Sequence, residues 1–119
     1  MSAKLLYVDD EPELRDLVEN QLQLEGYEVT TASDGVNALE ILKENNFDVI
    51  LLDVRMPRMG GIEVLQQLHN LNLHPRTIML TGDNDIAVLA RCACFGVYDY
   101  LTKPYNFHEL VSSIDRAML

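Results

Sequence analysis

The stretch "DVILLD" (residues 48–53) sets four apolar residues in a row between two aspartates. A strand that is covered by helices on both faces has no polar face, so its sequence shows a continuous apolar run instead of alternation. Further runs of strand length lie along the chain: "KLLYV" (4–8), "EVTTA" (28–32), "TIML" (77–80) and "VYDYL" (97–101). The sequence therefore predicts a buried parallel strand over 48–53 and four strands beside it.

A helical pattern of apolar residues follows each predicted strand. In the first, over 12–25, Pro12 suits the first helical position and Gly26 suits the stop. The last begins with a capping box, Asn106 with Glu109 three residues on. The positions expected to face the core are Leu14, Leu17, Val18 and Leu22; Val36, Leu39 and Leu42; Ile62, Leu65 and Leu68; Ile86, Leu89 and Ala93; and Leu110, Val111 and Ile114. Strict alternation of five strands and five helices predicts one α/β domain over 1–119, a doubly wound parallel sheet in three layers.

Composition narrows the class of protein. With 119 residues, 48% of them hydrophobic, the chain can bury the core of one globular domain. The formal net charge of −10 argues against direct binding of nucleic acid and favours a cation or a basic partner. No apolar run approaches the ~18 residues of a membrane span, which predicts a cytoplasmic protein without a membrane anchor. Two cysteines and three histidines lack disulfide or zinc spacing, so we expect reduced thiols and surface imidazoles: Cys92, Cys94, His69, His74 and His108.

Polar residues stand where the predicted strands end. Asp9 and Asp10 follow the first strand, Asp53 ends the third, and Thr81 and Lys103 follow the fourth and fifth. Each also has an ordinary structural explanation when taken alone. The first two acids could precede a helix, where the dipole favours them. Asp53 could begin a turn, Thr81 could cap a helix, and Lys103 could be a surface lysine. Because ligands of open parallel sheets bind beyond the carboxyl ends of the strands, all five are expected on one rim, and this coincidence favours a site.

The chemistry of such a rim is restrictive. Carboxylates ~4 Å apart repel by roughly 1–4 kcal/mol per pair, so three together should hold a proton or a cation. Hard oxygen ligands suit Mg²⁺, and a carboxylate can attack phosphorus to give an aspartyl phosphate. The hypothesis is that Asp9 and Asp10 position the metal, Asp53 is the nucleophile, and Lys103 and Thr81 meet the transferred oxygens.

Four motifs carry a resemblance to a known family. They are "VDDE" (8–11), "DVRMPRMGG" (53–61), "MLTG" (79–82) and "DYLTKPY" (99–105). In their order and spacing the chain resembles the receiver domain of a two-component response regulator, over essentially its whole length. The resemblance implies a five-stranded sheet in the order 2-1-3-4-5. It also implies that Asp53 accepts phosphate from a sensor histidine kinase or a phosphotransfer protein, in a signalling domain that catalyses only its own phosphorylation and dephosphorylation.

The resemblance extends to individual residues. It implies that Mg²⁺, or Mn²⁺, is bound by Asp9, Asp10, Asp53 and the backbone carbonyl of Arg55. It implies that Thr81 and Tyr100 shift together after phosphorylation, and that the peptide before Pro104 is cis.

Other positions are expected to tune this chemistry. Arg55 and Asp83 lie two residues beyond the acceptor and the switch hydroxyl, where their side chains should control the access of water to phosphorus. Gly82 stands where the family often has alanine, which leaves room over the acceptor for a phosphoryl group in contact with its backbone. Tyr98 and Tyr105 stand in place of a frequent acid and a frequent phenylalanine.

The expected output surface is the face of the fourth helix, the fifth strand and the fifth helix. Alternation puts Tyr98 and Tyr100 on one face of that strand, near a helix expected to begin at Asn84. This surface should contact a downstream protein, an effector domain or a second phosphorylated copy. The sequence leaves open a stand-alone receiver or part of a longer regulator.

Two rival functions fit the sequence less well. A Mg²⁺-dependent hydrolase would want a second carboxylate where Arg55 stands. A flavodoxin-like nucleotide-binding module would want a glycine- or hydroxyl-rich loop in place of the acids after the first strand.

Overall fold

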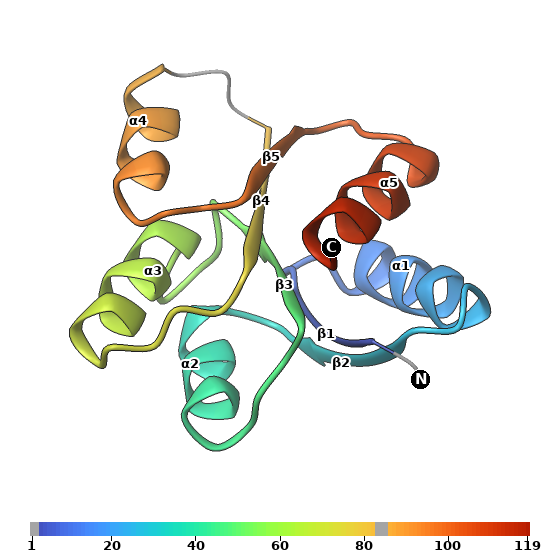
Figure 1. The fold of residues 1–119 in the computed structure, drawn as a ribbon, viewed down its shortest axis with the longest axis horizontal. Helices are drawn as coiled ribbons and strands as arrows, with labels where there is room; N and C mark the ends of the chain where they lie inside the picture. Colours follow the sequence, from blue (N-terminus) through green and yellow to red (C-terminus); the bar gives the residue numbers. More distant parts are fainter. Residues whose placement is uncertain (1–2, 83–85) are drawn as a thin grey trace.

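The chain folds as a parallel five-stranded sheet in the order β2-β1-β3-β4-β5, with a helix after each strand (Figure 1). The structure, a computed structural model, describes residues 3–82 and 86–119. Its elements are β1 (Lys4–Val8), α1 (Pro12–Leu24), β2 (Glu28–Ala32), α2 (Gly35–Glu44), β3 (Val49–Asp53), α3 (Gly61–Asn70), β4 (Thr77–Thr81), α4 (Ile86–Cys94), β5 (Asp99–Thr102) and α5 (Phe107–Ala117). The predicted class, layers and strand order are confirmed.

Helices cover both faces of the sheet. Figure 1 shows α2, α3 and α4 on one side and α1 and α5 on the other. Successive side chains of β1 enter the two cores alternately: Leu6 packs on the α2–α3 side and Leu5 on the α1–α5 side. All five residues of β3 are buried, as its apolar run predicts.

Parallel pairing brings the carboxyl ends of the strands to one edge. Val8 of β1 pairs with Leu52 of β3, and Asp53 pairs with Leu80 of β4. Thr81 pairs with Thr102 of β5. The residues that follow these strands therefore emerge side by side, which is the arrangement expected of the predicted rim.

Two predicted core positions are exposed instead. Leu17 on α1 is 55% exposed, and Ala93 on α4 is also exposed. One residue of helix turns the chain by about 100°, so Leu17 points away from the buried Val18 beside it. On α4 the fully buried residue is Cys92, one position before Ala93. Both thiols are free, as predicted.

The fifth strand begins two residues later than predicted. Its pairing starts at Asp99, opposite Ile78, and Tyr98 precedes it with its N–H donating to the carbonyl of Thr77. Gly96, at φ +74°, turns the chain between α4 and this strand. Tyr98 therefore lies outside β5, and the predicted strand bounds of 97–101 are corrected to Asp99–Thr102.

The segment from β5 to α5 agrees with its predictions. The Lys103–Pro104 peptide is cis. The Asn106 side chain caps α5 by accepting from the Glu109 N–H at 2.8 Å. Within the described ranges, no helix is both long and apolar enough to cross a membrane.

Asp99 ties β5 to α5, and its charge should make stability depend on pH. Its Oδ2 accepts from Ser113 Oγ at 2.6 Å and from Arg116 at 3.3 Å, and its Oδ1 accepts from the Tyr100 N–H. Burial alone would raise the pKa of Asp99, but these donors and the guanidinium lower it overall. The stabilisation is therefore present above the unfolded pKa of about 3.9 and is lost as pH falls through the lower folded pKa.

We expect Asp99→Asn to reduce the free energy of unfolding by about 1–2 kcal/mol at pH 7. The deficit should shrink as pH falls below about 4. Urea denaturation at pH 7 and at a pH below about 4 measures this deficit, with Asp16→Asn at an exposed position as the control. A deficit independent of pH would contradict this role for the charge.

Candidate functional site

Three carboxylates meet at the carboxyl edge of the sheet. One oxygen from each of Asp9, Asp10 and Asp53 lies within 4.8 Å of the others. Asp9 and Asp53 are 0% and 5% exposed, and Asp10 is half-buried. They come together because β1 and β3 are neighbours and both end at this edge. Three carboxylates in a partly buried space repel one another, and a bound cation would relieve this repulsion.

Asp9 is held by partners on several sides. Its Oδ1 accepts from the Glu11 N–H at 3.0 Å, and its Oδ2 accepts from the Tyr7 hydroxyl at 2.9 Å. Lys103 Nζ lies 3.5 Å from the same Oδ2. The sequence interpretation missed Tyr7 because it stands in an apolar run. The signal was its place two residues before Asp9, on the same face of the strand.

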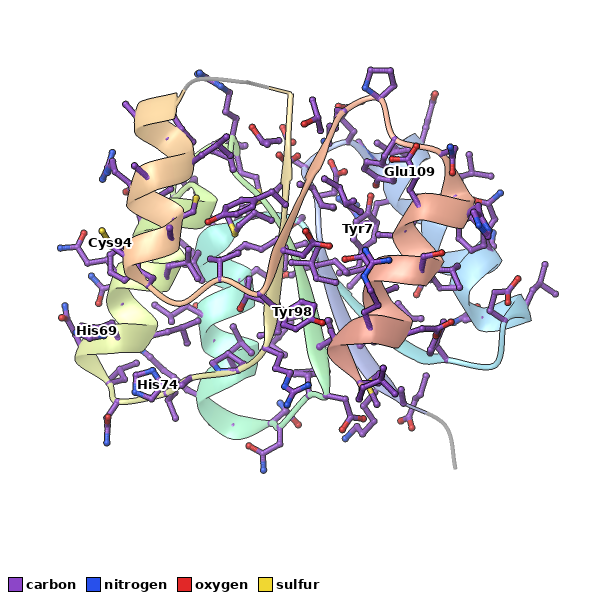
Figure 2. The ribbon with its side chains drawn as sticks, turned by 45° about the horizontal axis from the view of Figure 1, so that its top comes forward. Tyr7, His69, His74, Cys94, Tyr98 and Glu109 are labelled. Atoms are coloured by element: carbon purple, nitrogen blue, oxygen red, sulfur yellow. The ribbon has the colours of Figure 1, made fainter. Side chains whose placement is uncertain are left out.

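Tyr7 is a hydrogen-bond donor to this site. Its side chain is fully buried, and Figure 2 labels it in the interior of the molecule. Burial raises the pKa of the Tyr7 hydroxyl, and the nearby Asp9 carboxylate adds to the effect, so the proton stays on Tyr7. The carboxylate of Asp9 is thereby oriented before any ligand arrives.

Asp53 and Lys103 form the second pair of the site. Lys103 Nζ donates to Asp53 Oδ2 at 2.8 Å, while the Arg55 N–H donates to Asp53 Oδ1 at 3.3 Å. Burial raises the pKa of Asp53, with Lys103 opposing and Asp9 adding to the rise. For Lys103, burial acts to lower the pKa, but the carboxylates of Asp53 and Asp9 raise it overall. Lys103 therefore stays an ammonium beside the predicted acceptor.

A tyrosine hydroxyl adjoins this charged cluster. Tyr105 packs against the α1–α5 core, and its Oη is buried without a hydrogen-bond partner among the described residues. Burial raises the pKa of Tyr105, while the charge of Lys103 acts in the opposite direction. The sequence analysis noted only that Tyr105 stands in place of a frequent phenylalanine, and the structure puts its buried hydroxyl beside the charged cluster.

Thr81 and Gly82 close the rim at the end of β4. Thr81 is 1% exposed, and its carbonyl accepts from the Lys103 N–H at 2.6 Å, which keeps the β5–α5 segment next to β4. A Cβ added to Gly82 would meet no atom of the described residues within 4 Å, so none of them fills the space around this position. The structure thus brings Thr81, Lys103 and the three acids to one edge.

Other predicted residues lie around this edge or outside the described ranges. Tyr100 is half-buried, and its hydroxyl donates to the Leu89 carbonyl of α4 at 3.4 Å. The side chain of Arg55 is exposed. Asp83 and the expected helix start at Asn84 lie outside the described residues. His69, His74 and His108 are exposed, as predicted.

The loop after Asp53 folds back tightly against the end of β3. The Gly61 N–H donates to the Val54 carbonyl at 2.9 Å. A Cβ at Gly61 would clash with the backbone oxygen of Asp53, so this approach admits only glycine.

Comparison with known proteins identifies the family. The family model of the response regulator receiver domain matches residues 5–115 of this chain. The chain belongs to this family. It is a receiver domain of two-component signalling, and the predicted resemblance is confirmed.

Curated relatives of this receiver domain are longer than the chain. It is 36% identical over 119 residues to the response regulator MprA of Mycobacterium ulcerans, covering all of this chain and 51% of that protein. It is 38% identical over 112 residues to the transcriptional regulatory protein CpxR homolog of Haemophilus influenzae, covering 94% of this chain and 48% of that protein. The receiver domain thus spans about half the length of these relatives.

Solved structures share its fold along nearly the whole chain. The chemotaxis response regulator CheY4 of Vibrio cholerae is 34% identical, with a TM-score of 0.90 and coverage of 98% of this chain and 99% of that one. The response regulator TrrA of Thermotoga maritima, solved in complex with Mg²⁺–BeF, is 32% identical, with a TM-score of 0.86 and the same coverages.

Proposed function

We propose that the receiver domain accepts a phosphoryl group on Asp53 from the phosphohistidine of a sensor histidine kinase or a phosphotransfer protein. The observation that carries the proposal is the set of three carboxylates within 4.8 Å, with Lys103 Nζ 2.8 Å from Asp53. A carboxylate oxygen of Asp53 forms a bond to phosphorus while the P–N bond to histidine breaks, and the bonding electrons go to the ring nitrogen. The domain thus catalyses its own modification and, later, its hydrolysis.

The acid cluster fits a divalent cation. Three carboxylates from neighbouring strand ends supply hard oxygen ligands, with the backbone carbonyl of Arg55 proposed as a fourth. We assign the metal site to Asp9, Asp10, Asp53 and Arg55, with Mg²⁺ preferred and Mn²⁺ also suited. When bound, the cation neutralises charge on the phosphoryl oxygens. The Mg²⁺–BeF complex of the Thermotoga relative supports this assignment.

Lys103, Thr81 and Gly82 would hold the transferred group. Lys103 is ion-paired to Asp53 Oδ2, and its long stem lets the ammonium follow the negative charge to a phosphoryl oxygen. The Thr81 hydroxyl and the Gly82 backbone stand at the end of the adjacent strand, where they would donate to the remaining oxygens. Positioning and charge neutralisation are what phosphoryl transfer mainly requires.

The test is loading with the small phosphodonor acetyl phosphate. We expect one adduct of about 80 Da in the intact mass when Mg²⁺ is present, and no adduct when EDTA replaces the metal. Equal loading in EDTA would overturn the metal-dependent mechanism, and no adduct under any condition would overturn the function.

We further propose that Arg55 and Asp83 set the lifetime of the phosphoryl group. The side chain of Arg55 is exposed, and the backbone N–H of the same residue donates to Asp53. The side chain can therefore stand between solvent and the phosphorus atom. We expect Arg55→Ala to change the decay rate of the adduct by about 2- to 10-fold without preventing its formation. Unchanged decay in Arg55→Ala and Asp83→Ala would show that water enters by another route.

The proposed output surface is the α4–β5–α5 face. Tyr100 connects the site to it, because this residue pairs with Met79 on β4 and donates to Leu89 of α4. Movement of Thr81 toward a phosphoryl oxygen would change the space available to the Tyr100 side chain. It would thereby change the contact between Tyr100 and Leu89. The partner is a downstream protein, an effector domain or a second copy, and we expect ~1–3 kcal/mol of coupling.

Amide chemical-shift mapping with fluoroberyllate, a phosphoryl mimic, tests this output. We expect shifts that start at Asp53 and extend through residues 86–105. Shifts confined to the acid rim would contradict the switch and leave Thr81 as a phosphate ligand alone.

A further inference from the structure

A hollow of about 560 Å³ lies at the end of the sheet opposite the acids. It is lined by residues of α3, the start of β4, the α4–β5 loop and the end of α5. Thr77, the first residue of β4, lines it, whereas Thr81 at the acid rim is the last residue of that strand. Four steps along the strand separate the two by about 13 Å. The hollow is therefore distinct from the proposed phosphorylation site.

The body of the hollow is apolar. Leu65 and Leu68 of α3 are buried in its wall, and Phe95 and Val97 are half-buried there. On its rim Tyr98 is 45% exposed. Its volume and mostly apolar lining match those of small-molecule sites.

Aromatic rings form one side of this space. The His69 ring packs edge-on against His74, with centroids 6.1 Å apart, and against Phe95, at 6.0 Å. In Figure 2 His69 and His74 are labelled at the lower left and Tyr98 at the lower centre, far from Glu109 at the start of α5. These rings offer faces and edges to a flat ligand.

The charge of the lining is opposite to that of the chain. The domain carries a net charge of −10, yet the lining residues include Arg76 and Arg116 and no aspartate or glutamate. Arg116 is partly neutralised by Asp99, 3.3 Å away. Arg76 is exposed and donates through Nη1 to the backbone oxygens of Ala117 and Leu119, and among the described residues it is in none of the side-chain ion pairs.

We propose that this hollow binds a small organic anion, a carboxylate attached to an aromatic ring. The ring would lie against Leu65, Leu68 and the imidazoles, and the carboxylate would pair with Arg76. A guanidinium has five N–H donors, and the two carbonyls use only one nitrogen of Arg76, so donors are left for a carboxylate.

The experiment titrates the ¹⁵N-labelled protein with 2-naphthoate and, separately, with the neutral 2-naphthamide. We expect saturable shifts of amides lining the hollow, such as those of Thr77, Val97 and Tyr98, with naphthoate binding about tenfold or more tighter than naphthamide. Equal binding of the two probes would overturn the assignment to a carboxylate. Absence of saturable shifts at these amides would overturn the site.

Variants of the lining residues make the test specific. Arg76→Gln should weaken naphthoate binding about tenfold or more, whereas Arg91→Gln, an exposed arginine outside the hollow, should leave it unchanged. If Arg76→Gln unfolds, Leu73→Glu on the rim replaces it and should repel the carboxylate. Undiminished binding in the folded variant would contradict the proposal. So would dilution-dependent shifts of Tyr98 without ligand, because a second copy would then cover the hollow.

Discussion

We expect Asp53→Asn to take up no phosphoryl group from acetyl phosphate, at any concentration of Mg²⁺. The amide that replaces the carboxylate is a far poorer nucleophile toward phosphorus, while its size and shape are nearly the same. Its oxygen can still accept from Lys103, which lies 2.8 Å from the native carboxylate, so the variant should keep the fold. Intact-mass spectrometry should show the adduct of about 80 Da in the parent and none in the variant.

A matched control comes from the residue just before β3, at the other end of that strand. Asp48 precedes β3, is exposed and lies at the opposite end from the acid cluster. Asp48→Asn should load like the parent, because its change in charge is the same but its position is remote. An adduct that persists in Asp53→Asn would show that another side chain is the acceptor.

Asp10→Asn should weaken Mg²⁺ binding by about tenfold or more. It removes one of three negative charges whose oxygens lie within 4.8 Å, and such a pair interaction is worth ~1–4 kcal/mol. Among the described residues Asp10 has no hydrogen-bond or ion-pair partner, so the same change relieves repulsion and should stabilise the metal-free fold. Calorimetric titration measures the first effect, and urea denaturation in EDTA measures the second.

Asp9→Asn separates the two effects. Asp9 is buried, and it accepts from the Tyr7 hydroxyl and lies beside Lys103. Its neutralisation should also weaken Mg²⁺ binding, but it disturbs a buried pair and should lower the stability of the metal-free fold. The sequence assigned both acids the same role of positioning the metal, and only their burial and partners distinguish them. Unchanged Mg²⁺ affinity in both variants would count against the assigned metal site.

The architecture was predictable because the composition of a strand reflects whether its faces are buried. The apolar run of β3 indicated burial on both faces, and all five of its residues are buried. Alternation of strands and helices then implied parallel pairing, which places Asp53 and Thr81 at one edge. The start of β5 was not predictable in this way, since "VY" at 97–98 continues an apolar pattern. It is decided by the turn at Gly96 and by pairing that begins at Asp99.

The partners within the site were harder to predict than its acids. Tyr7 reads as a core residue, and its bond to Asp9 depends on which way its ring extends in the packed interior. The hollow is harder still, because Arg76, Tyr98 and Arg116 come from separate segments and share no sequence motif. Only the fold brings them together.

The most direct measurement is chemical localisation of the phosphoryl group. Borohydride reduces an aspartyl phosphate to homoserine, and trypsin then releases Asp53 on the peptide of residues 44–55 and the two cluster acids on the peptide of residues 5–15. After loading with acetyl phosphate and Mg²⁺, tandem mass spectrometry should place homoserine at position 53 alone. Homoserine at position 9 or 10, or at neither peptide despite a mass adduct on the intact protein, would contradict the assignment of Asp53 as the acceptor.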